Sequence, residues 1–258
     1  MTLPTPNKDL GQHFLVDDNI LGVIGRLAEL DPQDVVLEVG PGLGVLTTYL
    51  ADRVARVHSV ELDRSLEPHL TDRLGERANV EVVFGDAMRT DLSALRPPPQ
   101  KFVANLPYNV ATPLVVESLD GLPSLELWTV MVQREVADRF FATPRTKAYG
   151  AVSVLVQLQA RKVGFHAVPP TVFKPRPRVE SALVAFERIE GPSLDLVRPV
   201  VIAAFAHRRK TLANSLALVG IASRAEAEHA LAAIGEPPGA RAEELVPQDF
   251  VALADALR

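Results

Sequence analysis

The feature that most constrains the fold of this chain is a regular alternation of strand and helix patterns along its first half. The segment DVVLEVG (34–40) is a β-branched apolar run that stops at a glycine, as a buried strand does. Further strand patterns lie at 56–63, 79–87, 101–108 and 127–135, and helical patterns at 18–30, 45–53 and 64–75. Because strands that alternate with helices run parallel, this order predicts an α/β fold with a doubly wound sheet covered on both faces.

The second half of the chain departs from this alternation of strands and helices in two places. We expect an antiparallel pair of strands over 152–165 and 181–189, joined by the proline-rich, basic connection 169–181. After EGPS (190–193), four segments carry helical apolar spacing: 195–207, 209–219, 223–234 and 247–257. The sequence therefore predicts a large α/β domain over 1–190 and a small all-α domain over 191–258.

Composition narrows the class of protein. The 258 residues include no cysteine, which excludes disulfides, thiolate chemistry and cysteine-based metal centres and suits a cytoplasmic protein. The opening segment is polar and proline-rich, unlike a signal peptide, and no apolar run approaches the ~20 residues of a membrane helix. The six histidines show no metal-binding spacing. We therefore expect a cytoplasmic protein with no metal and no membrane contact.

The first strand ends in a glycine-rich turn, LEVGPGLG, with Gly40, Gly42 and Gly44. Glycines at this edge of a sheet let the backbone approach a ligand closely, although the alternative is simply a tight turn. A dinucleotide fingerprint places its third glycine one position later, where this chain has Val45. With Glu38 ahead of the glycines, the pattern becomes E-x-G-x-G-x-G. This form is typical of Rossmann-like sheets that bind S-adenosylmethionine, which has no pyrophosphate.

The next two strands also end in acidic residues. Glu61 can accept hydrogen bonds from both hydroxyls of a ribose, although it could equally be a surface acid at a strand end. Asp86, in GDA, can accept a hydrogen bond from the adenine amino group of the cofactor, and the backbone amide of Ala87 can meet a ring nitrogen. Three successive strands each end in a group that can bind this cofactor. Together they favour an S-adenosylmethionine site over a separate structural explanation for each residue.

The fourth strand ends in NLPY, residues 105–108. The exocyclic amine of adenine is a poor nucleophile because its lone pair is delocalised into the ring. Two hydrogen-bond acceptors turn the amine toward tetrahedral geometry and direct its lone pair at a methyl group. Asn105 offers its side-chain carbonyl, and Leu106 offers its backbone carbonyl. Pro107 stiffens the turn, and Tyr108 provides a face on which a flipped base can stack. The alternative is an Asx-type turn that caps the next helix.

Together with GQHFL (11–15), these motifs resemble the ribosomal RNA adenine dimethyltransferase family, and most of all the members that dimethylate two adjacent adenines near the 3′ end of small-subunit (16S) ribosomal RNA. Further blocks follow that family's order: QREVADRF, KAYGAVSVLVQ, VPPTVFKPRPRVESALV, AFAHRRKTLANSL and RAEELVPQDF. The likeness covers nearly the whole chain. It implies a methyltransferase domain over 1–190 that uses S-adenosylmethionine, a recognition domain for RNA or the ribosome over 191–258, and a role in small-subunit maturation.

The resemblance also implies roles for individual residues. His13 and Leu15 would contact the cofactor together with the strand-end residues described above, and the family often has Asn where His13 stands. Phe173, in TVFKPRP, would be a second aromatic of the target pocket and would face Tyr108 across the base. Taken without the family, an aromatic in this proline-stiffened loop is either a stacking surface or a small core anchor.

Basic residues are concentrated in two places, although the net charge is −5. The span 139–178 holds eight Lys and Arg residues with no Asp or Glu, and HRRK (207–210) follows later. Such blocks neutralise phosphates, while the alternatives are a solvated face for the first and favourable contact with helix carbonyls for the second. The predicted RNA-binding residues are Arg145, Lys147, Lys174, Arg176, Arg178, Arg208, Arg209 and Lys210. The expected partner is the RNA of the small ribosomal subunit or its precursor, and we expect a monomer.

Other functions remain open. One is a non-catalytic RNA-binding assembly factor, against which the intact turn 105–108 speaks. Another is a large-subunit ribosomal RNA adenine methyltransferase of the antibiotic-resistance type, which the blocks FKPRPRVES and HRRKTLANSL disfavour. A nicotinamide oxidoreductase is disfavoured by the glycine spacing.

Overall fold

The computed structural model describes residue 4 and residues 12–258, so Gly11, the first residue of the motif GQHFL, lies outside the described residues. The contacts divide the chain into two compact units. One unit extends to Ala137 and includes Lys162–Arg188, and the other consists of Asp138–Arg161 and Ile189–Arg258. The sequence placed its division at 190/191, whereas the contacts also group residues 138–161 with the C-terminal helices. The functional roles of the two parts stay predictions.

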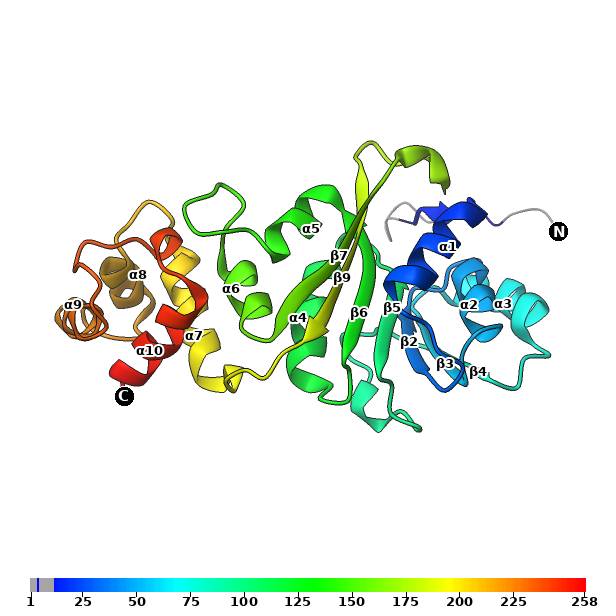
Figure 1. Cartoon of the computed structure of the whole chain (residues 1–258), viewed down its shortest axis with the longest axis horizontal. Helices are drawn as coiled ribbons and strands as arrows, with labels where there is room; N and C mark the ends of the chain where they lie inside the picture. Colours follow the sequence, from blue (N-terminus) through cyan, green and yellow to red (C-terminus); the bar gives the residue numbers. More distant parts are fainter. Residues whose placement is uncertain (1–3, 5–11) are drawn as a thin grey trace. The chain divides into compact units, whose positions relative to one another are not determined.

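A seven-stranded sheet, in the order β4-β3-β2-β5-β6-β9-β7, organises the first unit (Figure 1). Its strands are β2 (Val35–Val39), β3 (Arg56–Glu61), β4 (Val80–Phe84), β5 (Lys101–Asn105), β6 (Leu127–Gln133), β7 (Ala160–Val168) and β9 (Ser181–Arg188). Strands β2 to β6 pair in parallel, and β9 runs antiparallel to β6. The predicted α/β class is confirmed, with β9 between β6 and β7.

Helices cover both faces of this sheet. They are α1 (Asp18–Leu27), α2 (Val45–Ala51), α3 (Glu67–Leu74) and α4 (Ala111–Gly121). Apolar residues of α1 and α2 share one core cluster with Val36, Val103 and Met131, which the strand register places on one face. Trp128 points to the opposite face, and its Nε1 donates to Ser118 Oγ of α4 at 2.9 Å. The carboxyl ends of the parallel strands therefore form an edge between two helical layers.

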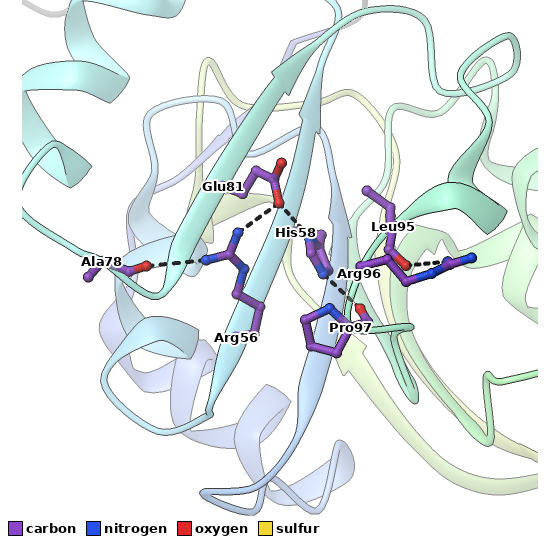
Figure 2. Close-up of polar contacts among 7 residues, drawn as sticks. All are labelled: Arg56, His58, Ala78, Glu81, Leu95, Arg96 and Pro97. Atoms are coloured by element: carbon purple, nitrogen blue, oxygen red, sulfur yellow. Dashed lines mark hydrogen bonds and ion pairs between the residues drawn. The ribbon is translucent and has the colours of Figure 1, made fainter.

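A polar network joins the edge strand β4 to β3 (Figure 2). The strand register places it on the face opposite Glu38. The fully buried His58 places Nδ1 3.0 Å from Glu81 Oε2 and Nε2 2.9 Å from the Pro97 carbonyl. Arg56 Nη2 donates to the same Glu81 oxygen at 2.8 Å. The Arg56 guanidinium holds the pKa of Glu81 below its usual range. The network thus ties β3, β4 and the segment around Pro97 together.

A second, two-stranded sheet joins segments that lie far apart in the chain. Strand β1 (Phe14–Leu15) pairs antiparallel with β8 (Phe173–Lys174), so that Leu15 lies opposite Phe173. His13 continues the contact, because its Nδ1 lies 2.8 Å from the Pro175 carbonyl. The described start of the chain is therefore held against the proline-rich connection.

The remaining helices are α5 (Arg134–Phe140), α6 (Ala151–Gln157), α7 (Leu194–Ala206), α8 (Leu212–Val219), α9 (Arg224–Ala233) and α10 (Pro247–Ala256). The four predicted C-terminal helices are confirmed. The expectation of a strand over 152–165 is wrong for its first part, because α6 occupies 151–157 and β7 starts only at Ala160. The Gly150 amide donates to Ser153 Oγ at 3.1 Å, which fixes the helix start. None of the helices described is both long and apolar enough to span a membrane.

Candidate active site

One pocket lies at the carboxyl ends of β2, β3, β4 and β5, which are neighbours in the sheet. It brings together all the predicted cofactor positions: His13, Leu15, Glu38, Gly40, Gly42, Glu61, Asp86, Ala87 and Asn105. Leu106, Pro107 and Tyr108 line the same pocket. Residues from five separate segments of the sequence therefore meet at one place.

The glycine-rich turn needs its glycines for two reasons. Gly40 and Gly42 have φ values of +76° and +57°, a region that side-chain-bearing residues rarely adopt. A Cβ on Gly42 would lie 3.1 Å from the Phe14 ring, and a Cβ on Gly40 would lie 3.4 Å from the Pro107 ring. The turn is thus packed between the β1 segment and the turn 105–108, and its backbone forms the pocket wall.

Glu38 and Glu61 differ in their surroundings. Glu38 is fully buried and accepts a hydrogen bond from Ser59 Oγ at 2.7 Å. Burial raises the pKa of Glu38 to about 7, although the hydroxyls of Thr47 and Ser59 oppose the shift. Glu61 accepts from the Gly42 amide at 3.1 Å and from the Asp63 amide at 2.8 Å.

Burial also raises the pKa of Glu61, while the Asp63 and Gly42 amides oppose the shift. These two amides fix the orientation of its carboxylate at the pocket wall. Ser59, the partner of Glu38, was not predicted from the sequence. Because it is a serine within a strand and belongs to no motif, only the pairing of Glu38 with Ser59 between β2 and β3 reveals it.

The charge of the pocket fits S-adenosylmethionine and does not fit a dinucleotide. Three carboxylates line it, and no Lys or Arg is found among its described lining residues. A pyrophosphate would meet repulsion there, whereas a sulfonium cation and a ribose diol match carboxylate acceptors. Among the described residues, those of the pocket included, no group of three or more His, Asp or Glu residues is placed to hold a metal ion.

Two apolar side chains complete the pocket beside its acidic residues. Leu62 and Met88 are 54% and 40% exposed, and both line the pocket. The Met88 amide donates to Asp86 Oδ1 at 2.9 Å, which folds the chain back at the end of β4. The pair offers apolar contact for a planar base. The sequence signal for them, an apolar residue just after an acidic strand end, was missed.

The turn 105–108 presents two carbonyl oxygens. Asn105 Nδ2 donates to the His13 carbonyl at 3.2 Å, which leaves its Oδ1 as the end able to accept from a ligand. The Leu106 amide donates to Met131 at 3.0 Å, and none of the described residues donates to the Leu106 carbonyl. Helix α4 has no side-chain cap, so Asn105 does not play the capping role that the sequence left open.

Two side chains hold Tyr108, one at its hydroxyl group and the other beside its ring. Its hydroxyl lies 2.6 Å from Ser181 Oγ, and its ring centroid lies 5.6 Å from that of His13 at an interplanar angle of 31°. Burial raises the pKa of Tyr108, so its hydroxyl remains neutral. Ser181 was not predicted as a site residue, because it lies 73 positions away at the start of β9.

Phe173 is not brought into the pocket. It is 4% exposed and packs in a core cluster with Leu15 and Val172, and it is absent from the described lining of the pocket. This placement is the core anchor that the sequence offered as the alternative to a stacking surface.

The predicted RNA-binding residues are all exposed and form two groups. Lys174 ends β8, and Arg176 and Arg178 lie in the connection between β8 and β9 of the first unit. In the second unit, Arg208 Nη2 donates to the Lys147 carbonyl at 2.9 Å. This bond places the segments 145–147 and 208–210 side by side and gathers five cations.

Comparison with known proteins identifies the family of this chain. The chain matches the family "Ribosomal RNA adenine dimethylase" over residues 4–255. It is 50% identical over 252 residues to "Ribosomal RNA small subunit methyltransferase A" of Rubrobacter xylanophilus, covering 97% of this chain and 94% of the relative. The protein of the same name from Kineococcus radiotolerans is 47% identical over 96% of this chain and 85% of its own.

Two solved structures share the fold. The 23S rRNA methyltransferase ErmE is 31% identical, with a TM-score of 0.66 over 95% of this chain and 99% of its own. A dimethyladenosine transferase from Plasmodium falciparum has a TM-score of 0.78 at 24% identity, over 93% of this chain and 96% of its own. With its family match over almost the whole length, this chain belongs to the ribosomal RNA adenine dimethylase family.

Proposed function

We propose that this chain uses S-adenosylmethionine to dimethylate the exocyclic 6-amino groups of two adjacent adenines near the 3′ end of small-subunit (16S) ribosomal RNA. The observation that carries the proposal is a pocket with carboxylates and no described Lys or Arg, which ends at the paired carbonyls of Asn105 and Leu106. We place this activity in small-subunit maturation, in the cytoplasm. We expect the chain to act as a monomer.

When bound, S-adenosylmethionine supplies an electrophilic methyl group. Glu61 holds the ribose hydroxyls, the Asp86 carboxylate accepts from the adenine amine of the cofactor, and the Ala87 amide donates to its ring. The bare backbone at Gly40 and Gly42 allows close approach. The pocket therefore binds the nucleoside part through strand-end groups that are already in place.

The turn 105–108 acts on the target adenine. Asn105 Oδ1 and the Leu106 carbonyl accept the two amine hydrogens, which directs the nitrogen lone pair out of the ring plane. A once-methylated amine keeps one N–H, so one of the two carbonyls suffices to orient it for the second transfer. Tyr108 provides the stacking face for the base. Catalysis here is orientation and hydrogen bonding, since a low-pKa amine needs no strong base.

RNA binding is assigned to the two exposed basic groups. Lys174 belongs to β8, which pairs with the pocket-lining β1, and Arg176 and Arg178 follow it in the connection to β9. The five cations at 145–147 and 208–210 offer a second set of phosphate contacts. The relatives at 50% and 47% identity are named for the small subunit, whereas the large-subunit enzyme ErmE is 31% identical, and this difference favours the small subunit.

The test is transfer of labelled methyl groups from S-adenosylmethionine to small ribosomal subunits that lack these modifications, followed by nucleoside analysis. Large subunits are treated in parallel. We expect dimethyladenosine in the small-subunit RNA only. Label in the large subunit would point to the resistance-type activity, and cofactor binding without transfer to either subunit would favour an assembly factor.

A further inference from the structure

The contact between Tyr108 and Ser181 is not used by the function described so far. The Tyr108 Oη and Ser181 Oγ atoms lie 2.6 Å apart, and Ser181 is completely buried. Ser181 opens β9 opposite Gln133, the last residue of β6. Because β9 runs antiparallel to β6, its first residue lies at the same edge of the sheet as the carboxyl ends of the parallel strands. The hydroxyl of Tyr108 therefore reaches past β6 to a strand that carries none of the cofactor site.

We propose that Ser181 is a positioning residue for methyl transfer, whose hydroxyl fixes the tip of Tyr108 and so sets the position of the ring on which the target adenine stacks. The inference rests on the proposed function and adds to it a residue 73 positions away from Tyr108. Ser181 contacts neither cofactor nor base in this account. It acts only through Tyr108.

The geometry indicates that the bond between Tyr108 and Ser181 positions the whole ring of Tyr108 and not only its hydroxyl group. Two torsions, χ1 and χ2, place a tyrosine ring. The hydroxyl oxygen lies on the χ2 axis, so its bond to Ser181 fixes where the ring lies, and a neighbour beside the ring limits its rotation about that axis. The imidazole of His13 lies beside the ring at 5.6 Å and is itself held by the Pro175 carbonyl. Together, Ser181 and His13 define the ring orientation, and stacking energy depends on that orientation. A misplaced platform moves the amine away from the carbonyls of Asn105 and Leu106.

A double-mutant cycle tests this proposal with Ser181→Ala, Tyr108→Phe and the combined variant, assayed on small subunits. Each single change removes the same bond and leaves the other hydroxyl, which is partly or fully buried, without its partner. We expect each single variant to lose about tenfold in kcat and the double variant to lose about the same, because the bond can be lost only once. The Kd for S-adenosylmethionine should stay at the wild-type value in all three.

Thr129→Val is the matched control. Thr129 lies on β6, on the same sheet face as Asn105, and is completely buried. Its Oγ1 has no hydrogen-bond partner within the described chain, so the change removes a buried hydroxyl without breaking a bond. We expect wild-type kcat for this variant. A loss like that of Ser181→Ala would show that kcat responds to any change in this sheet and would overturn the proposal.

Two further results would also overturn it. One is wild-type kcat in Ser181→Ala, and the other is losses that multiply in the double variant, since independent losses mean that the two hydroxyls do not act on each other. A parallel drop in melting temperature and cofactor affinity, with kcat unchanged, would assign the bond to stability alone. If the wild-type chain transfers no methyl group, the proposed function fails and this inference with it. Transfer by the wild type with multiplying losses contradicts the role of Ser181 only.

Discussion

At the scale of single residues, the pocket contains two glutamates whose side chains are alike but whose environments differ. Glu38 and Glu61 lie at the ends of neighbouring strands, yet Glu38 is completely buried with a serine hydroxyl as partner. Glu61 meets two backbone amides, which orient its carboxylate along the pocket wall. We therefore propose Glu61 for ribose binding, whereas the Glu38 carboxyl is held by the Ser59 hydroxyl.

Replacing Glu61 by Ala should weaken S-adenosylmethionine binding by roughly 10- to 100-fold, because two hydroxyl groups lose a charged acceptor. Glu61→Gln keeps the shape and one acceptor oxygen, so its loss should be smaller. Isothermal titration calorimetry measures both affinities. An unchanged Kd in Glu61→Ala would remove this residue from the ribose.

The raised pKa of Glu38 predicts a pH-dependent stability. The unfolded chain releases the Glu38 proton at the ordinary value near 4.5, whereas the folded chain keeps it until about 7. Between these values the folded state binds more protons, so the free energy of unfolding falls as pH rises, by roughly 3 kcal/mol in total. Glu38→Gln lacks this dependence.

Urea unfolding of wild type and Glu38→Gln at about pH 5 and about pH 8 checks this sign. The wild type should lose stability relative to the variant on going to the higher pH. A difference between the two proteins that does not change with pH would mean that Glu38 ionises normally in the folded state.

The sequence could locate the strand-end residues because parallel strands bring their carboxyl ends to one edge, whatever the packing elsewhere. It could not reveal Ser59 or Ser181, whose roles follow from strand register and from a contact across β6. The sequence left two roles open for Phe173, and the structure places this side chain in a core cluster. Contacts that depend on strand register and packing leave no local pattern in the sequence, so they could not be predicted from it.

At the scale of elements, the long alternating segments were predicted to within a few residues and the short ones were not. The run VSVLVQ in α6 alternates like a strand, but it is buried and its start is fixed by the Gly150–Ser153 bond. Strands β1 and β8 have two residues each, so they exist only as a pair. Their sequence carries no period that could have indicated them.

The network in Figure 2 makes a prediction for the edge strand β4. Arg56 lowers the pKa of Glu81 in the folded chain. The ionised Glu81 side chain therefore stabilises the fold fully at pH values above its ordinary pKa, and this stabilisation is lost as the pH falls through the lowered pKa. Glu81→Gln should therefore unfold at a lower urea concentration than wild type at neutral pH. The two midpoints should converge in acid.

Glu76→Gln, which changes an exposed glutamate just after α3, is the matched control and should behave as wild type at both pH values. A Glu81→Gln midpoint equal to wild type at neutral pH would show that the network adds nothing to the attachment of β4.

At the scale of the whole molecule, the chemistry belongs to the first unit and a large share of the exposed cations to the second. The pocket is complete within residues of the first unit. The group at 145–147 and 208–210 belongs to the second. Changes to these cations should therefore alter substrate affinity and leave the cofactor site intact.

Replacing both Arg209 and Lys210 by Ala should raise the KM for small subunits and reduce its salt dependence, because two phosphate contacts are lost. The Kd for S-adenosylmethionine should not change. Arg224→Ala is the control, since Arg224 is an exposed cation of the same unit that pairs with Glu228 at 2.7 Å. An equal rise in KM for both variants would mean that binding follows net charge alone.

The measurement that tests the central claim most directly is single-turnover methyl transfer to small subunits by Asn105→Ala, with the Kd for S-adenosylmethionine measured on the same preparation. If the Asn105 carbonyl orients the target amine, the rate should fall by roughly 100- to 1,000-fold while the cofactor still binds with little loss. A rate near that of wild type, with both adenines dimethylated, would contradict the assignment of the chemistry to the turn 105–108.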